Sequence, residues 1–149
     1  MISYRDMIAL DVPILVGLEK SIFPESPWSA AQFKEELSGV PRTRKYVVAM
    51  DENELVGYGG IALAGDVADI HTLTVIPTYR KRGIATEMLH LLENWAIERD
   101  VSALMLEMRE GNAEAQPLYE KQGYSVVSRR DNYYAPGIHA LIMRKELAK

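Results

Sequence analysis

The chain has 149 residues, 48% hydrophobic and 26% charged, a composition typical of a soluble globular domain, and we expect one domain over residues 1–149. The net charge of −4 argues against nucleic-acid binding through a basic surface and weakly favours a basic protein partner. Cysteine is absent, which excludes disulfides, thiolate zinc sites and a cysteine nucleophile. Without a signal segment or a membrane-length apolar run, we expect a cytoplasmic protein that does not bind membranes.

The N-terminal part predicts a short strand at residues 2–7 and two helices. Asp11 is placed as the first N-cap, with Pro13 in the first turn. The second helix starts from a capping box at Ser29–Gln32 and ends at Gly39. The first helix is expected to bury an apolar face made of Ile14, Leu15, Leu18 and Ile22.

A three-stranded meander is expected next, with strands at 45–50, 55–63 and 67–75. Pro77 ends the third strand. The middle strand is interrupted by glycines, which indicate a bulge or the close approach of another backbone: Gly57, Gly59 and Gly60.

The C-terminal half alternates helices with strands. Residues 83–99 form the clearest helix, because apolar residues recur there at three- and four-residue steps. Residues 101–108 are apolar on both faces and indicate a central strand. A helix is expected at about 112–122, and Pro117 fits it only if the helix starts late or bends. The result is an α/β domain on a mixed sheet, completed by strands at 124–129 and 140–144.

A basic turn, Arg80-Lys81-Arg82-Gly83-Ile84-Ala85, joins the meander to the longest helix. Free N–H groups at a helix N-terminus, the positive end of its dipole and a small residue together form an anion site. Cations are otherwise unfavourable at this end, so a bound pyrophosphate explains three of them in a row. A solvated basic turn is the alternative. The spacing matches neither a P-loop nor a dinucleotide-binding glycine pattern.

The spacing Arg80-x-x-Gly83-x-Ala85 resembles the signature Arg/Gln-x-x-Gly-x-Gly/Ala of the GCN5-related N-acetyltransferase (GNAT) family. The order of elements resembles that family over essentially the whole chain. The resemblance implies the GNAT fold, a single mixed, mostly antiparallel central β-sheet flanked by about four helices. Further segments resemble the ribosomal-protein-alanine N-acetyltransferases (RimI): Pro27-Trp28-Ser29 followed by Phe33, Leu106-Glu107-Met108-Arg109, Asn112, Leu118-Tyr119-Glu120-Lys121-Gln122-Gly123-Tyr124 and Arg130-Asp131-Asn132-Tyr133-Tyr134.

The resemblance implies that acetyl-CoA is the co-substrate and that the acetyl group passes directly to an amine in a ternary complex, without a covalent acyl-enzyme. The pantetheine arm would lie along Leu73, Thr74 and Val75, with the Val75 N–H polarising the thioester oxygen. The pyrophosphate would bind the backbone amides of Lys81 to Thr86, and Asn112 would contact the cofactor further along.

Acetyl transfer to an amine needs a proton acceptor, because the amine arrives mainly as ammonium, and the CoA thiolate benefits from a proton donor. Glu107 is the candidate base, because a carboxylate in a central, buried strand is costly unless it is paired or functional. A strand-end glutamate paired with Arg109 or Arg82 is the alternative. The resemblance assigns Tyr119 as the donor to the CoA sulfur, and a half-buried core tyrosine is the alternative.

Three aromatic residues, Trp28, Tyr133 and Tyr134, fall in segments that border the peptide groove of the subfamily, although Trp28 would serve equally as a hydrophobic staple. The subfamily acetylates the N-terminal alanine of a small-subunit ribosomal protein, a basic chain. The resemblance therefore implies acetylation of a protein or peptide N-terminus, with the oligomeric state left open. The sequence departs from the expected pattern at Ile138-His139, where acidic residues are expected, which puts peptide specificity in doubt.

Two other functions are compatible with this fold: acetylation of a small amine such as a polyamine or an antibiotic, and non-catalytic sensing of acyl-CoA. Intact Glu107 and Tyr119 argue against the sensor. No metal is implied, because the three histidines have no metal-ligand spacing. Of these, His90 is expected on the surface, and His71 is either a packed strand residue or an aid to proton transfer.

Overall fold

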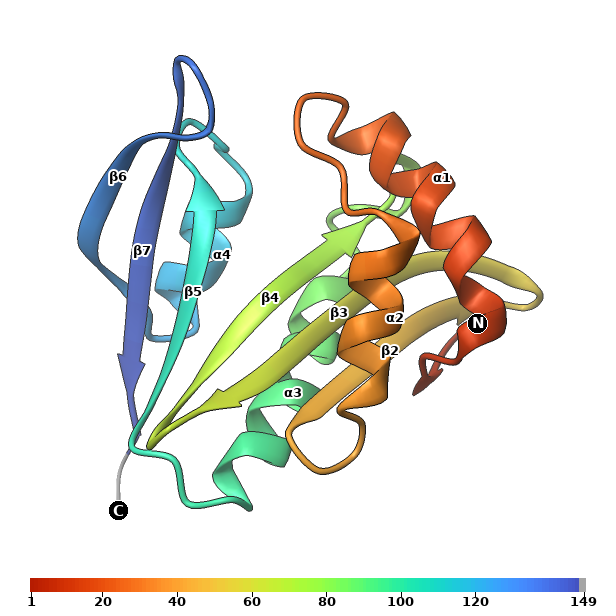
Figure 1. The fold of residues 1–149 in the computed structure, drawn as a ribbon, viewed down its shortest axis with the longest axis horizontal. Helices are drawn as coiled ribbons and strands as arrows, with labels where there is room; N and C mark the ends of the chain where they lie inside the picture. The colour runs from red at the N-terminus through yellow and green to blue at the C-terminus, as the bar shows by residue number, and fades with distance from the viewer. Residues whose placement is uncertain (148–149) are drawn as a thin grey trace.

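The computed structural model describes residues 1–147 and contains a seven-stranded sheet with helices on both faces (Figure 1). The helices are α1 (Val12–Ile22), α2 (Ala30–Ser38), α3 (Ile84–Ile97) and α4 (Ala115–Lys121), with 3-10 turns η1 (Ala9–Asp11) and η2 (Pro77–Tyr79). The strands are β1 (Ile2–Asp6), β2 (Arg44–Asp51), β3 (Glu54–Ala64), β4 (Val67–Val75), β5 (Ala103–Arg109), β6 (Ser125–Ala135) and β7 (Ile138–Glu146).

The strand order is β1-β2-β3-β4-β5-β7-β6. The pair of β4 with β5 is parallel, and the other neighbouring pairs are antiparallel. The sheet is therefore mixed and mostly antiparallel, as the resemblance predicted. Among residues 1–147 no helix is long and apolar enough to cross a membrane.

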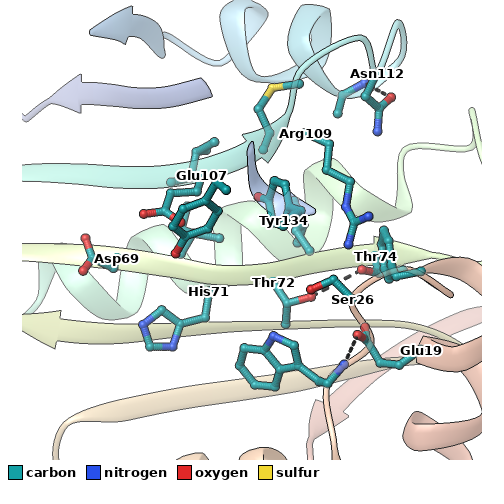
Figure 2. A pocket seen from close by; sticks show the side chains of 18 of the residues that line it. Glu19, Ser26, Asp69, His71, Thr72, Thr74, Glu107, Arg109, Asn112 and Tyr134 are labelled. Carbon is teal, nitrogen blue, oxygen red and sulfur yellow. Dashed lines mark hydrogen bonds between the residues drawn. The ribbon is translucent and has the colours of Figure 1, made fainter. Parts of the chain in front are cut away.

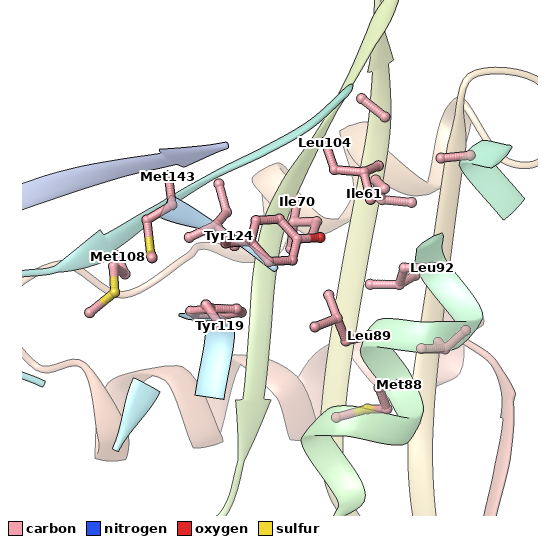
Figure 3. Packing of buried hydrophobic residues seen from close by; sticks show 14 of the residues in the cluster. Ile61, Ile70, Met88, Leu89, Leu92, Leu104, Met108, Tyr119, Tyr124 and Met143 are labelled. Atoms are coloured by element: carbon pink, nitrogen blue, oxygen red, sulfur yellow. The ribbon is translucent and has the colours of Figure 1, made fainter. Parts of the chain in front are cut away.

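Two apolar clusters hold the helices against the sheet. On the face covered by α3, Met88, Leu89 and Leu92 pack over Ile61 and Ile70, and the residues around α4 extend the same cluster (Figure 3). On the opposite face, covered by α1 and α2, the second cluster contains Leu15, Phe33, Tyr46, Val48 and Tyr58. The sheet is thus the middle layer of a three-layer domain (Figure 1).

The first helix buries part of its predicted face, since Leu15 is buried and Leu18 and Ile22 are half-buried, and it also buries residues that were not predicted. Its buried residues are Val12, Leu15 and Glu19, whereas Ile14 is 55% exposed. The difference arises because Glu19, an acid that periodicity places outside, accepts hydrogen bonds from the Tyr58 hydroxyl and the Trp28 amide and is drawn inward.

The predicted start of α2 is confirmed, and α4 is shorter than expected. The capping box of α2 forms, with Ser29 Oγ accepting from the Gln32 amide at 3.2 Å and Gln32 Oε1 accepting from the Ser29 amide at 2.8 Å. Helix α4 starts late, at Ala115, after the Asn112 carboxamide caps its first amides. Pro117 then lies in the first turn, where its missing N–H costs no helical hydrogen bond.

The last strands are longer than predicted. The first extends to Ala135 instead of ending at Arg129, and the second covers Ile138–Glu146 instead of 140–144. The polar stretch between Arg129 and Asn132 is tolerated because β6 is the edge strand of the sheet and these residues are exposed.

Both expectations for the glycines of β3 are confirmed. A Cβ at Gly60 would lie 2.0 Å from the Tyr46 ring, and one at Gly57 would lie 3.1 Å from the Thr74 carbonyl oxygen. Opposite Gly60 and Ile61, β4 contains one extra residue, His71, which forms a bulge.

The Gly60→Ala substitution is expected to destabilise the fold by about 1–3 kcal/mol, because the buried Tyr46 ring is held by its hydroxyl and cannot move away. Urea unfolding measures the change. Gly17→Ala is the matched control: nothing lies within 4 Å of the added methyl group, so this variant should gain about 0.5–1 kcal/mol. Equal free energies of unfolding for the two variants would contradict the steric argument.

The two central strands separate along their length. Pairing of β4 with β5 is confined to Val67–Ile70 opposite Ala103–Leu106. Beyond the bulge at His71, β4 continues along β3 while β5 stays with β7, so the two strands diverge (Figure 1). The divergence opens the middle of the sheet and positions the site.

Candidate active site

A cleft of about 940 Å³ occupies the gap between β4 and β5. Its walls come from the α1–α2 connection, α2, β4, β5, α4 and the β6–β7 hairpin. Segments far apart in the sequence therefore contribute side chains to one cleft (Figure 2).

Half of the predicted site residues line this cleft. They are Trp28, Leu73, Thr74, Glu107, Asn112, Tyr119, Tyr133 and Tyr134. The other predicted residues lie outside the lining: Val75 is the last residue of β4, and the turn from Arg80 to Thr86 follows η2.

The end of β4 presents an open backbone edge. The Ile76 amide donates to the Val56 carbonyl at 2.9 Å, so these two residues form a hydrogen-bonded pair of the antiparallel ladder. Because such pairs alternate, the N–H groups of Leu73 and Val75 point away from β3, toward the side that β5 has left. The Val75 carbonyl is occupied, since it accepts from Arg80 Nε at 3.0 Å.

The basic turn ends in a left-handed glycine that starts α3. Gly83 has φ 80° and nothing within 4 Å of where a Cβ would lie, so the backbone is open on this side. The Glu87 amide donates to the Gly83 carbonyl at 3.1 Å, and the amides just before it have no acceptor within the helix. Arg80 and Arg82 are exposed beside these amides. Free amides at a helix N-terminus beside exposed cations are an arrangement that favours anions.

Glu107 points into the cleft from β5 and is less buried than predicted. Its side chain is 35% exposed, because the neighbouring strand has diverged and leaves this face open. Its partners are Arg130, whose guanidinium lies 3.7 Å away, and Tyr133, whose pKa is raised by its hydrogen bond to Glu107. The alternative pairing with Arg109 or Arg82 is not found: Arg109 binds Glu25, and Arg82 stacks on Tyr79.

Tyr119 reaches the cleft from the opposite face of the sheet. The residue is 7% exposed and packs edge-to-face on Tyr124, with ring centroids 5.8 Å apart (Figure 3). Burial, more than the nearby Tyr134, raises the pKa of the Tyr119 hydroxyl, so the group holds its proton at neutral pH. Glu107 and Tyr119 thus reach the cleft from the two faces of the sheet.

Aromatic rings form the outer walls of the cleft. Trp28 packs against Phe33, with their ring centroids 5.2 Å apart, as expected for a hydrophobic staple of α2. The Trp28 side chain also lines the cleft. Across the cleft, burial raises the pKa of Tyr134 to about 12.

Arg109, which the sequence suggested only as a possible partner of Glu107, lies between Phe23 and Tyr134. Its guanidinium carbon is 4.7 Å and 4.5 Å from the two ring centroids. Desolvation lowers the pKa of this guanidinium. The stack joins β5 to the α1–α2 connection.

Several carboxylates that the sequence did not single out also line the cleft: Glu19, Glu35, Glu36 and Asp69. Glu36 accepts from Arg44 Nε at 2.7 Å and from the Tyr46 hydroxyl at 3.0 Å, and it lies 3.0 Å from His71 Nδ1. His71 is therefore an exposed residue of the cleft lining that contacts Glu36 and Tyr46. With Arg109 and Arg130 as the cations among the cleft residues, the lining is net acidic.

The remaining histidines lie outside the cleft lining. His90 is exposed on α3 and contacts Gln122, as expected. His139 Nδ1 accepts from the Asn132 amide at 3.0 Å and fixes the β6–β7 turn. Among the described residues no group of three or more His, Asp or Glu side chains is arranged to hold a metal ion.

Comparison with known proteins identifies the family. A profile described as "Acetyltransferase (GNAT) family" matches residues 14–124. The chain belongs to the GNAT acetyltransferase family. It is an N-acetyltransferase, and the fold described above is the GNAT fold.

Relatives of this GNAT acetyltransferase are found among RimI proteins. It is 35% identical to the N-alpha-acetyltransferase RimI of Mycobacterium tuberculosis over 135 residues, 87% of this chain and 82% of that protein. It is 32% identical to the [ribosomal protein bS18]-alanine N-acetyltransferase of Haemophilus influenzae over 108 residues, 72% of this chain and 71% of that protein.

The structure of this GNAT acetyltransferase also matches a solved one. The crystal structure of the ribosomal-protein-S18-alanine N-acetyltransferase from Escherichia coli superposes with a TM-score of 0.84 at 25% identity, covering 100% of this chain and 96% of that one. A longer uncharacterized protein of Mycobacterium leprae is 36% identical over 142 residues, and the chain spans 38% of its length.

Proposed function

We propose that the enzyme transfers the acetyl group of acetyl-CoA to the α-amino group of a protein, the N-terminal alanine of a small-subunit ribosomal protein. The relative named N-alpha-acetyltransferase supports the α-amino group as acceptor. The relatives named ribosomal-protein-alanine N-acetyltransferases support alanine of a ribosomal protein as the substrate. The observation that carries the proposal is the net acidic cleft, which contains Glu107 and Tyr119 on its two sides and ends at an open strand edge.

The residues at the end of β4 fit acetyl-CoA. The pantetheine arm carries amide groups, and the outward N–H groups of Leu73 and Val75 would hold them as an added strand does. The pyrophosphate would bind the amides of residues 81–86, beside Arg80 and Arg82. Asn112 would contact the cofactor from the other side of the cleft. When bound, acetyl-CoA supplies an activated acetyl thioester.

The chemistry assigns one proton acceptor and one donor. The substrate ammonium loses a proton to the Glu107 carboxylate and becomes a nucleophilic amine. As its C–N bond forms and the C–S bond breaks, the Tyr119 hydroxyl protonates the departing sulfur. The nitrogen's second proton restores the tyrosine, and Glu107 releases its proton to solvent. The products are the acetylated amine, CoA with a free thiol and one proton.

The shape and charge of the cleft favour a basic peptide. Trp28, Tyr133 and Tyr134 provide walls for an extended chain, and the carboxylates provide attraction for cationic residues. His139 occupies a position where acidic residues were expected, and it supports the β6–β7 turn instead of the cleft.

Mass spectrometry of reaction products tests the proposal. The protein is incubated with acetyl-CoA and a panel: peptides with N-terminal alanine followed by basic or by acidic residues, polyamines and aminoglycosides. We expect acetylation at the peptide α-amine, with kcat/KM higher for the basic peptide. Acetylation confined to the small amines would favour the alternative function, and binding without any product would indicate a sensor.

A further inference from the structure

Asp69 lies at the apex of the cleft, where β4 and β5 part. It pairs in register with Met105 of β5, and Glu107 lies two residues further along that strand. Because side chains alternate along a strand, Met105 and Glu107 share one face, and the register partner Asp69 points to the same face. The carboxyl groups of Asp69 and Glu107 lie on facing sides of the gap (Figure 2).

Two carboxylates of the cleft have no hydrogen-bond or ion-pair partner among the described residues, the exposed Glu35 and the half-buried Asp69. Glu19 is held by Tyr58 and Trp28, Glu36 by Arg44 and Tyr46, and Glu107 lies near Arg130. The Asp69 carboxylate makes no hydrogen bond or ion pair with any of residues 1–147, although the residue is half-buried.

An unpaired, half-buried carboxylate is unfavourable in an empty cleft. Desolvation raises the pKa of Asp69; the charge of Glu107 raises it further, and His71 opposes the shift. Glu107 has only the ion pair with Arg130, and the other cation among the cleft residues, Arg109, is stacked between Phe23 and Tyr134. A cation between Asp69 and Glu107 would relieve both groups.

We propose that Asp69 binds the ammonium group of the substrate beside Glu107. This inference rests on the proposed amine-acetylating function. Asp69 would bind the charged amine, and Glu107 would remove its proton. Asp69 would therefore contribute to binding of the substrate more than to the chemical step.

Steady-state kinetics of Asp69→Asn provide the first test. A peptide with N-terminal alanine and basic residues at the next positions is the probe. The variant should raise the KM for this peptide about tenfold or more, the loss expected for one charge-assisted hydrogen bond, with kcat within about twofold and the KM for acetyl-CoA unchanged. Glu98→Gln, an equal charge change at the exposed C-terminal end of α3, is the matched control and should change none of these values.

Binding without turnover gives the second test. The same peptide and its des-amino analogue, in which hydrogen replaces the terminal amine, are titrated calorimetrically into the wild type and the variant. The wild type should bind the amine form more tightly, and Asp69→Asn should lose most of that preference. The melting temperature of the variant should not fall, because Asp69 supports no other residue.

The outcomes separate the two proposals. If the wild type acetylates only small amines, the proposed function is wrong, and the KM comparison is made with that amine. An unchanged KM and an unchanged preference for the amine form would overturn the role of Asp69. A lower kcat with unchanged KM would also overturn it, by placing Asp69 in the chemical step.

Discussion

Replacing Glu107 with glutamine is expected to lower kcat by about 10²- to 10⁴-fold, because the amide cannot accept the proton of the substrate ammonium. The side chain keeps its size, and its partners Arg130 and Tyr133 are exposed or half-buried, so the fold should be unchanged. The rise of the rate with pH should be flattened. Any remaining rise should follow the α-amine of the peptide, centred near pH 8.

Glu110→Gln is the control for this experiment. Glu110 lies directly after β5, forms an exposed ion pair with Arg129 and is absent from the cleft lining. The Glu110→Gln substitution removes the same charge as Glu107→Gln, a few residues further along the chain, and should leave kcat and the pH–rate profile unchanged. A Glu107→Gln enzyme with nearly full kcat and an unaltered profile would show that another group accepts the proton.

Replacing Tyr119 with phenylalanine is expected to lower kcat by about 10²-fold or more, because the CoA thiolate then leaves without a proton donor. The ring and its packing on Tyr124 are retained. The hydroxyl makes no hydrogen bond to another of the described residues, so stability and acetyl-CoA affinity should change little. Stopped-flow measurement of a single turnover separates this loss from slow product release.

Tyr124→Phe is the matched control, since Tyr124 is a buried neighbour outside the cleft lining whose hydroxyl donates to Glu93 at 2.7 Å. That variant leaves a buried carboxylate with one donor fewer and should lose about 1–3 kcal/mol of stability with kcat preserved. Tyr119→Phe should therefore lose kcat and keep its stability, whereas Tyr124→Phe should lose stability and keep its kcat. An unchanged turnover number for Tyr119→Phe would remove the tyrosine from the mechanism.

Local patterns were sufficient for most of the fold. The apolar period of α3, the capping box at Ser29 and the proline at 117 each depend on a few neighbouring residues, and the structure agrees with them. The predicted face of α1 was only partly right, because the partner that buries Glu19 is Tyr58, which is distant in sequence. The length of β6 was underestimated because an edge strand needs no apolar alternation.

The site was predictable where a motif or a strand end defined it. Glu107 and Tyr119 were singled out from their segments, and both reach the cleft. The exposure of Glu107, the stacked Arg109 and the unpaired Asp69 depend instead on where β4 and β5 stop pairing. That point is set by contacts between segments distant in the chain, which periodicity along one segment does not report.

The one-residue bulge at His71 has a consequence for substrate binding. A bulge bends its strand and is maintained by backbone pairing, so the gap beside β4 exists in the folded protein before any ligand arrives. The two strands are already apart when the protein has folded. Ligand binding therefore does not have to supply the free energy that would separate them, and the affinity is not reduced by it. Co-substrate and amine would enter a preorganised opening, and the backbone of residues 72–75 should shift by less than about 1 Å when they bind.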